Sequence, residues 1–295
     1  MPNLPLVSVI MNCHDGQKYL SEAIDSIVSQ TYGHWELIFW DNQSTDMSAS
    51  IVKSYSDTRI RYFYAENYTN LGTARNFALT EARGDWVGFL DVDDLWFPEK
   101  LERQLDEIKK EQEDVGLCYS RCEFFRDIPH SGLIRRDKKI FPSSKTLPQE
   151  RIIDELFVGN LLPFPSILYR KDTLVTIGGV PEYKHPPDYF MSLAISLKWR
   201  VVAVNEVLCA YRLHQNNLSL SLKECGYRES IDIVQRLAPA NKAKRIETYH
   251  RTRLIIYLIM QMRWNEALRE TSRLTFYGLF WGLIGIFRYK LKFFY

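Results

Sequence analysis

The chain has 295 residues, 46% of them hydrophobic, so it can bury a large core as one or two domains. It contains no polar low-complexity segment, which excludes a largely disordered protein. The net charge of +2 says nothing about partners, but the charge is unevenly distributed. Residues 239–295 carry 11 Lys and Arg against 3 Asp and Glu, a net charge of +8, which leaves −6 for residues 1–238.

The first half of the chain alternates predicted strands with predicted helices. Short apolar runs indicate the strands, and apolar residues at helical spacing indicate the helices. This alternation is typical of a mostly parallel sheet with helices on both faces. The predicted strands are 7–11, 36–40, 60–64 and 86–90, and the predicted helices are 19–28, 47–55, 71–82 and 98–110.

Polar residues follow three of these strands directly, at positions 12–15, 41–42 and 91–93. Ligands of such folds bind where the carboxyl ends of parallel strands meet at one edge of the sheet. Asp91 and Asp93 are two residues apart, so they share one face of an extended chain. Two carboxylates there can hold Mg²⁺ or Mn²⁺ together with diphosphate oxygens. The alternative for this D-x-D is a solvent-exposed acidic loop.

The second half of the chain is less regular. Residues 126–150 are polar and contain three prolines, which predicts an extended loop, either an active-site lid or a plain surface loop. Further strands are predicted at 115–125, 167–169, 200–204 and 208–212, and further helices at 152–159, 189–197 and within 227–275.

The cysteines and the N-terminus indicate an intracellular protein. The five cysteines form an odd, scattered set without a C-x-x-C pair, so reduced, buried thiols are expected. The first residues lack a basic region followed by a long apolar one, and no signal peptide is expected.

Residues 6–105 resemble the nucleotide-binding half of an inverting family 2 glycosyltransferase. The matching blocks, in the same order and spacing, are VSVIMNCHDGQKYLSEAIDSIVSQTY, WELIFWDNQSTD, NLGTARNFAL and GDWVGFLDVDDLWFPEKLERQ. Weaker blocks, FPSILYRKD, IGGVPEYKHPPDYFMSLAISLKW and YRLHQNNLS, extend the resemblance to residue 219. It implies an α/β fold of the GT-A type, Rossmann-like, with a mostly parallel central sheet flanked by helices. The implied GT-A domain is 1–220, with a nucleotide-binding half at 1–110 and an acceptor half at 111–220, followed by a helical extension at 221–295.

The resemblance also implies contacts with a nucleotide-sugar donor, for which UDP is the expected nucleotide. Asn12 would be one of the donor contacts, and His14 would take the place of an aromatic residue that stacks on uracil. Asp41 would accept a hydrogen bond from the imide N–H of the base. Arg75 would bind the diphosphate with its guanidinium fork. The structural alternatives are a strand-end histidine satisfied by its neighbours, a turn aspartate and an arginine in a surface ion pair.

A divalent cation, Mn²⁺ or Mg²⁺, is the implied cofactor. Asp93 would be its direct ligand, and Asp91 would lie nearer the ribose or a water bound to the metal. Asp94 is expected to cap the following segment. His214 resembles a late histidine that reaches the metal or the diphosphate in many GT-A enzymes, although a lone histidine is more often structural.

Asp188 matches the carboxylate that acts as catalytic base on the acceptor side. It follows two prolines, which fix the backbone before it. Many relatives have an acidic residue directly before this aspartate, where this chain has Pro187. Glu182 is therefore the nearest alternative candidate for the catalytic base. The structural alternative for Asp188 is a helix N-cap. In the implied reaction, an acceptor hydroxyl displaces the diphosphate in one step, with inversion at the anomeric carbon.

Other nucleotide enzymes fit this sequence less well. A pyrophosphorylase would need a Gly-rich loop after the first strand, and a dinucleotide dehydrogenase would need G-x-G-x-x-G, which is absent. An aspartyl phosphatase carries its D-x-D on the first strand, whereas here the motif follows the fourth. A catalytically inactive GT-A module that binds nucleotide is the remaining alternative.

Residues 276–287 form an unbroken apolar run followed by basic residues. As a helix it would be about 18 Å long, too short for a bilayer core of about 30 Å. It suits an interfacial helix on an anionic membrane surface, although it could instead pack on the protein or form a dimer contact. The family resemblance implies a glycan or lipid-linked glycan acceptor, a location at the cytoplasmic face of the cell membrane and no nucleic-acid partner.

Overall fold

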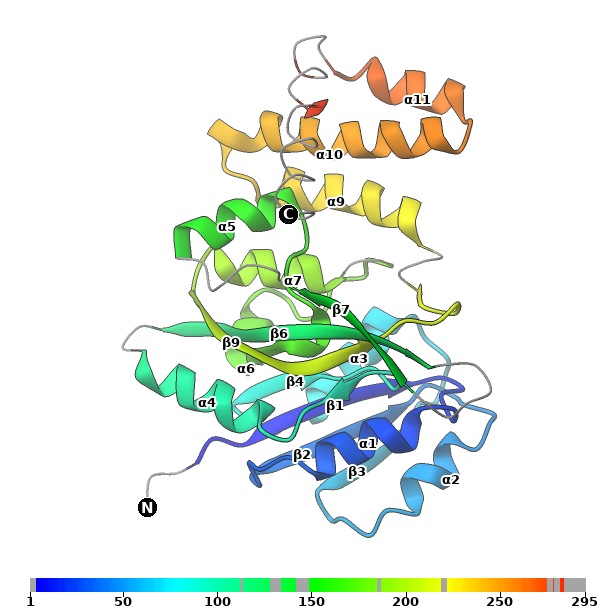
Figure 1. Ribbon diagram of the computed structural model, residues 1–295, viewed down its shortest axis with the longest axis vertical. Helices are drawn as coiled ribbons and strands as arrows, with labels where there is room; N and C mark the ends of the chain where they lie inside the picture. The colour runs from blue at the N-terminus through cyan, green and yellow to red at the C-terminus, as the bar shows by residue number, and fades with distance from the viewer. Residues whose placement is uncertain are drawn as a thin grey trace.

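The computed structural model has an α/β core with three helices stacked on one side of it (Figure 1). The first half of the chain forms one end of the molecule, and the last helices form the other. The structure describes residues 4–111, 114–127, 134–141, 149–184, 187–218 and 222–274, together with residues 278, 282 and 283.

Four parallel strands form the N-terminal half of the sheet, in the order β3-β2-β1-β4. A helix precedes each strand after β1, as the alternating sequence predicts. Cys13 lies opposite Asp41, and Ile10 lies opposite Phe89, so β2, β1 and β4 run toward the same edge. The elements are β1 Val7–Cys13, α1 Leu20–Val28, β2 Trp35–Asp41, α2 Ser48–Lys53, β3 Ile60–Tyr64, α3 Leu71–Glu81 and β4 Trp86–Phe89.

The second half of the chain extends the same sheet, which has nine strands within the described residues. β8 pairs with β4 and with β6 in antiparallel directions, whereas β6 and β9 are parallel. β5 and β7 add antiparallel to β9 and β6. The elements are β5 Leu95–Trp96, α4 Lys100–Lys110, β6 Val115–Asp127, β7 Ile134–Phe141, α5 Gln149–Val158, the 3-10 helix η1 Phe164–Ser166, β8 Ile167–Arg170, α6 Lys171–Thr176, α7 Pro187–Ser196 and β9 Arg200–Arg212.

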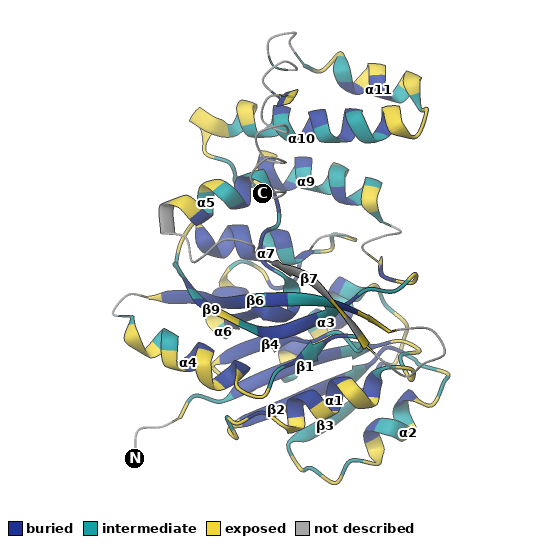
Figure 2. Cartoon of the chain, viewed as in Figure 1, coloured by how far each residue is buried: buried dark blue, intermediate teal, exposed yellow. Residues whose placement is uncertain are grey.

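Helices cover both faces of the sheet and bury its strands (Figure 2). Val9 and Met11 belong to an apolar cluster that includes α1, α2 and α4, whereas Ile10 belongs to a second cluster that includes α3, α5 and α7. This division follows from the two-residue alternation of side chains along a strand. All five cysteines are free thiols, and four of them are buried.

The helices α9 Lys223–Leu237, α10 Ala240–Met260 and α11 Trp264–Thr271 follow the sheet. They have a small apolar cluster of their own, which includes Ile231, Leu254 and Leu258. None of the helices in the described part of the chain is both long enough and apolar enough to cross a bilayer. Most of the apolar run 276–287 lies outside the described residues, but Gly282 packs against Thr252 of α10 too closely to leave room for a side chain.

Several predicted elements need correction. Residues 134–141, predicted to be loop, form β7, which pairs with an extended β6, while 128–133 and 142–148 lie outside the described residues. The two short strands predicted at 200–204 and 208–212 are one strand, β9, whose register against β6 shifts near Arg121. The sequence analysis also missed β5 and α6, which are only two and six residues long.

Candidate active site

The polar residues after β1, β2 and β4 lie at one edge of the sheet. Asp41 is paired in register with Cys13, and β1 lies between β2 and β4. The loop after β1 also abuts the D-x-D loop, since a Cβ on Gly16 would come within 2.9 Å of the Val92 side chain. The predicted convergence of three strand ends is therefore present in the structure.

The end of β1 presents an unsatisfied amide and an accessible ring. Neither the side-chain nitrogen nor the side-chain oxygen of Asn12 has a hydrogen-bond partner among the described residues, although both atoms are buried. Such atoms are costly to bury unless a ligand or water satisfies them. His14 donates from Nδ1 to the Asn42 carbonyl oxygen at 3.0 Å, and its ring centre lies 4.8 Å from that of Tyr68. His14 and Tyr68 thus offer two neighbouring, solvent-exposed rings near the end of β1.

Asp41 is fully buried at the end of β2. Its Oδ1 accepts a hydrogen bond from the Ser44 backbone N–H at 2.7 Å, and its Oδ2 accepts one from the Tyr62 hydroxyl at 2.7 Å. Burial, and then the contact with Asp41, raise the pKa of Tyr62. Because each carboxylate oxygen can accept two hydrogen bonds, Asp41 is held in place and retains capacity for a further donor.

Arg75 and Asp91 form an ion pair between α3 and the loop after β4. Arg75 Nη2 lies 2.8 Å from Asp91 Oδ1, and the guanidinium also lies 4.4 Å from the centre of the Phe164 ring. Arg75 is buried, whereas Asp91 is partly exposed. The ion pair brings together two residues that were assigned to the diphosphate and to the ribose or metal.

Asp93 and His214 meet across the sheet edge from distant parts of the sequence. His214 Nε2 donates to Asp93 Oδ2 at 2.8 Å. Burial, and then the charge of Asp91, raise the pKa of Asp93, while the hydrogen bond from His214 opposes this shift. The late histidine therefore lies beside the D-x-D motif.

The donor atoms around Asp93 fit a divalent cation that is shared with a nucleotide. Asp93 offers a carboxylate oxygen, the type of ligand that Mg²⁺ and Mn²⁺ favour, and His214 Nε2 would add a nitrogen ligand once it gives up its hydrogen bond to Asp93. Among the described residues, no group of three or more His, Cys, Asp or Glu could hold a metal ion unaided. The remaining positions of such an ion would belong to diphosphate oxygens and water, as is common for cations in nucleotide sites.

Two buried residues of this region were missed or misassigned. Asp94 does not cap a helix: its Oδ1 accepts the Arg212 backbone N–H at 2.9 Å. Burial and the charges of Asp93 and Asp91 raise the pKa of Asp94 well above its usual value. The Arg212 side chain is also buried, and its Nε donates to the Asp93 carbonyl oxygen at 2.9 Å. Arg212 precedes His214 by two positions, which was the signal that could have identified it.

Asp188 lies in the first turn of α7, which agrees with the predicted position near a helix start. Its Oδ2 accepts a hydrogen bond from the Asn160 amide at 2.6 Å. Burial, and then the nearby Asp188 charge, raise the pKa of Tyr169 on β8, and Arg75 acts on the same hydroxyl in the opposite direction. Asp188 and Arg75 are thus both close to Tyr169, whereas the alternative base, Glu182, is exposed.

The sequence model of the family described as "Glycosyl transferase family 2" matches residues 8–161. The chain belongs to this family. It is 33% identical to the uncharacterized glycosyltransferase RT0329 of Rickettsia typhi over 71% of its own length, and it spans 64% of that protein. It is 30% identical to the Escherichia coli UDP-Glc:alpha-D-GlcNAc-diphosphoundecaprenol beta-1,3-glucosyltransferase WfgD, over 72% of this chain and 79% of WfgD.

Solved structures show the same fold as this family 2 glycosyltransferase. S. aureus TarS 1–349 in complex with UDP aligns with a TM-score of 0.64 at 21% identity, covering 90% of this chain and 79% of TarS. The mannosyltransferase PcManGT from Pyrobaculum calidifontis, in complex with GDP-Man and Mn²⁺, aligns with a TM-score of 0.62 at 16% identity, covering 93% and 77%. The GT-A fold expected from the sequence is therefore confirmed.

Proposed function

We propose that this family 2 glycosyltransferase moves a sugar from a nucleotide diphosphate, with UDP as the favoured nucleotide, to an acceptor hydroxyl. The observation that carries the proposal is the edge of the sheet where the unsatisfied Asn12 amide, the buried Asp41 and the Asp93–His214 pair occur together. Asn12 and Asp41 suit a base with both donors and acceptors, and His14 suits stacking on it. The UDP complex of TarS, which has the same fold, supports this choice of nucleotide.

The proposed cofactor is Mn²⁺ or Mg²⁺, held by Asp93 and His214 with Asp91 nearby. When bound, a divalent cation supplies positive charge to the departing diphosphate. Arg75, which already contacts Asp91, would add a second positive charge beside the same group. Asp91 and Asp93 already pair with Arg75 and His214, and a cation between them would offset the remaining repulsion, which raises the pKa of Asp93.

Asp188 is the proposed catalytic base, and Asn160 holds its carboxylate in place. The acceptor oxygen would form a bond to the anomeric carbon, its proton would pass to Asp188, and the bond from the anomeric carbon to the diphosphate would break. One displacement of this kind inverts the anomeric configuration. General base catalysis typically contributes about 10²–10⁴-fold to the rate.

The proposed acceptor is a glycan or lipid-linked glycan of cell-surface polysaccharide assembly. WfgD, by its name a glucosyltransferase that acts on alpha-D-GlcNAc-diphosphoundecaprenol, supports a lipid-linked acceptor. An enzyme with such an acceptor works at a membrane surface, and the proposed location is the cytoplasmic face of the cell membrane. The alternative is a catalytically inactive nucleotide-binding module. The presence of Asp91, Asp93 and Asp188 argues against it.

The test is a screen of UDP-, GDP- and dTDP-sugars for slow hydrolysis in the presence of Mn²⁺, combined with titration calorimetry of the nucleotides. Asp188→Ala should bind the donor normally and lose turnover, whereas Asp93→Ala should lose metal-dependent nucleotide binding. Asp106→Ala, on the exposed side of α4, is the matched control and should behave as the wild type. Full activity of either site variant would refute its role. Nucleotide binding without hydrolysis of any donor would favour the inactive module.

A further inference from the structure

The turn between α10 and α11 exposes an unusual number of large apolar side chains. Met260, Met262, Trp264 and Leu268 are 75%, 77%, 56% and 67% exposed, and Ile259 is 39% exposed. These five residues, here called the apolar corner, fall within ten positions of the sequence. Scattered single exposed apolar residues are normal on protein surfaces, but a cluster of this size indicates an interaction site.

The backbone conformation of the turn shows that folding stability does not explain why residue 262 is a methionine. The Met262 N–H donates to the Ile259 carbonyl oxygen and the Arg263 N–H to that of Leu258, both at 2.9 Å, which is the hydrogen-bond pattern of a Schellman motif. Met262 has a φ of +58°, a left-handed conformation that favours glycine. The chain instead places a long apolar side chain there and exposes it to solvent.

The residues of the apolar corner belong to helices that pack against the rest of the helical extension. Ala267 and Glu270 of α11 are buried, and Ala267 belongs to the apolar cluster with α10. Trp264 and Leu268 are one helical turn apart, so they share the opposite, exposed face of α11. The exposed side chains are therefore presented by a packed scaffold and do not result from a helix end that fails to pack.

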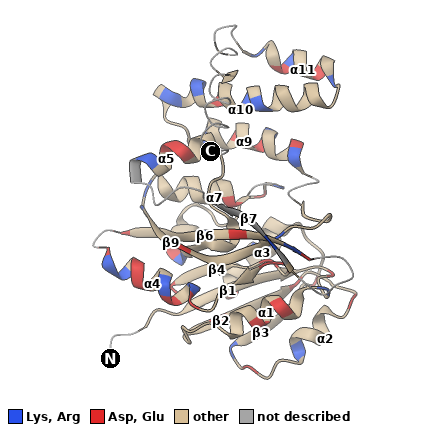
Figure 3. Ribbon diagram, viewed as in Figure 1, with Lys and Arg blue, Asp and Glu red and all other residues tan. Residues whose placement is uncertain are grey.

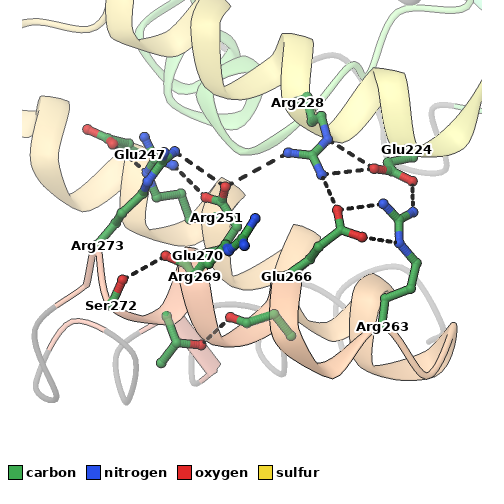
Figure 4. Close-up of polar contacts among 12 residues, drawn as sticks. Glu224, Arg228, Glu247, Arg251, Arg263, Glu266, Arg269, Glu270, Ser272 and Arg273 are labelled. Carbon is green, nitrogen blue, oxygen red and sulfur yellow. Dashed lines mark hydrogen bonds and ion pairs between the residues drawn. The ribbon is translucent and has the colours of Figure 1, made fainter.

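Charges around the corner favour an anionic partner. Figure 4 shows that the carboxylates of Glu224, Glu266 and Glu270 are all engaged by arginines of the same network. Arg269 is exposed on α11, and no ion pair within the described residues uses it. Over 259–274 there are three arginines against two glutamates, whereas the other basic cluster of the extension lies at the start of α10, away from the corner (Figure 3). Two copies of this chain meeting corner to corner would bring like charges together.

We propose that the apolar corner inserts into the headgroup region of an anionic lipid bilayer and docks the enzyme there. Surfaces that bind the interface of a membrane typically combine large apolar side chains, such as tryptophan and leucine, with nearby arginine or lysine. The apolar corner combines tryptophan, leucine and methionine with arginine in this way. This inference deepens the proposed function, because a lipid-linked acceptor requires the enzyme to work at such a surface. It adds a second candidate membrane contact to residues 276–287, whose predicted contact stays a prediction because most of them lie outside the described residues.

The test is flotation of the full chain with vesicles of equimolar phosphatidylglycerol and phosphatidylcholine, compared with vesicles of phosphatidylcholine alone. The wild type should bind the anionic vesicles more tightly. Met262→Gly removes the apolar side chain while giving the turn its favoured residue, so it should unfold at the same or a higher temperature but bind vesicles several-fold more weakly. The double variant Trp264→Ser/Leu268→Ser should lose roughly tenfold or more. Val175→Ser, at a 62% exposed position on α6, is the matched control and should bind as the wild type.

Wild-type vesicle binding by both corner variants would overturn the proposal. A monomer–dimer equilibrium in sedimentation experiments that the same variants abolish would also overturn it, since the corner would then join two copies. Hydrolysis of the donor in solution needs no membrane, so it separates this inference from the proposed function. Hydrolysis without vesicle binding rejects only the docking surface, and vesicle binding without hydrolysis of any donor rejects only the transferase.

Discussion

The Arg212 side chain donates from Nε to the backbone carbonyl oxygen of Asp93 at 2.9 Å, and thereby fixes the D-x-D loop to the end of β9. The Arg212 backbone N–H donates to Asp94 as well, and its guanidinium pairs with Asp127 at the end of β6. Because β9 ends two residues before His214, one strand end positions both members of the Asp93–His214 pair. Arg212 is therefore a positioning residue for the proposed metal site.

Arg212→Lys should weaken Mn²⁺-dependent nucleotide binding by about tenfold, since an ammonium cannot replace the planar fork that reaches several acceptors at once. The free energy of unfolding should also fall by about 2 kcal/mol, because a buried hydrogen-bonded group is lost. Calorimetric titration of Mn²⁺ and UDP, alongside urea denaturation, measures the two effects. Arg103→Lys on the exposed side of α4 is the control. A variant that is less stable but keeps wild-type Mn²⁺ affinity when folded would reduce Arg212 to a purely structural residue.

Asn160→Ala should lower turnover without changing donor affinity, because the Asn160 amide holds the Asp188 carboxylate at 2.6 Å. A carboxylate that is free to rotate takes the acceptor proton less efficiently, so the effect should appear in kcat. Initial rates at saturating donor, with donor binding measured separately, provide the readout. Asn160→Asp keeps the size of the side chain but has no amide donor. If Asn160→Asp lowered turnover less than Asn160→Ala does, the result would contradict this role for the hydrogen bond.

Tyr62→Phe should weaken UDP binding by a few-fold and reduce the preference for UDP over GDP. The Tyr62 hydroxyl donates to Asp41 Oδ2 at 2.7 Å, so its removal frees a carboxylate that is proposed to read the base. The loss of one hydrogen bond to a charged group corresponds to about 1.5–3 kcal/mol at most. Competition between UDP and GDP for the same protein measures the selectivity. Tyr64→Phe, an exposed position on the same strand, should leave it unchanged.

The strand-end part of the site could be predicted from the sequence because it follows from local patterns. Asn12, Asp41 and Asp91 directly follow the predicted apolar strands, and parallel strands bring their carboxyl ends together whatever the details of packing. His214 was found through resemblance alone, since nothing in its own surroundings indicates a partner 121 residues away. The edge of the sheet was thus predictable, whereas contacts across it were not.

The residues that the sequence analysis missed depend on long-range packing. Tyr62 reaches Asp41 from a neighbouring strand, and Arg212 reaches Asp93 over a separation of 119 residues. β7 was missed because a polar, charged strand at the edge of a sheet lacks the apolar pattern that identifies buried strands. The sequence also gave no sign that Met262 adopts a left-handed conformation, because methionine is not a turn residue.

His250 should make the free energy of unfolding depend on pH between 6.5 and 5. This residue is buried on α10, its Nε2 donates to the Phe157 carbonyl oxygen at 2.9 Å, and its Nδ1 has no partner within the described residues. Burial, assisted by the charge of Arg253, lowers the pKa of His250 to about 3. The unfolded chain therefore takes up a proton below its ordinary pKa of about 6.5 while the folded protein does not, so stability is lost as the pH falls through this range.

The expected loss is about 1.4 kcal/mol for each pH unit below 6.5, or about 2 kcal/mol by pH 5. His250→Gln keeps a side-chain donor for the Phe157 carbonyl oxygen but cannot titrate, so it should lack this part of the pH dependence. Urea denaturation of both proteins at pH 7 and pH 5 isolates the contribution, because the carboxylates that titrate at lower pH are common to both. Since Phe157 is in α5 and His250 is in α10, equal pH dependence of the two proteins would show that this contact is open to water in solution and that the helical extension docks less tightly on the core than its hydrogen bond indicates.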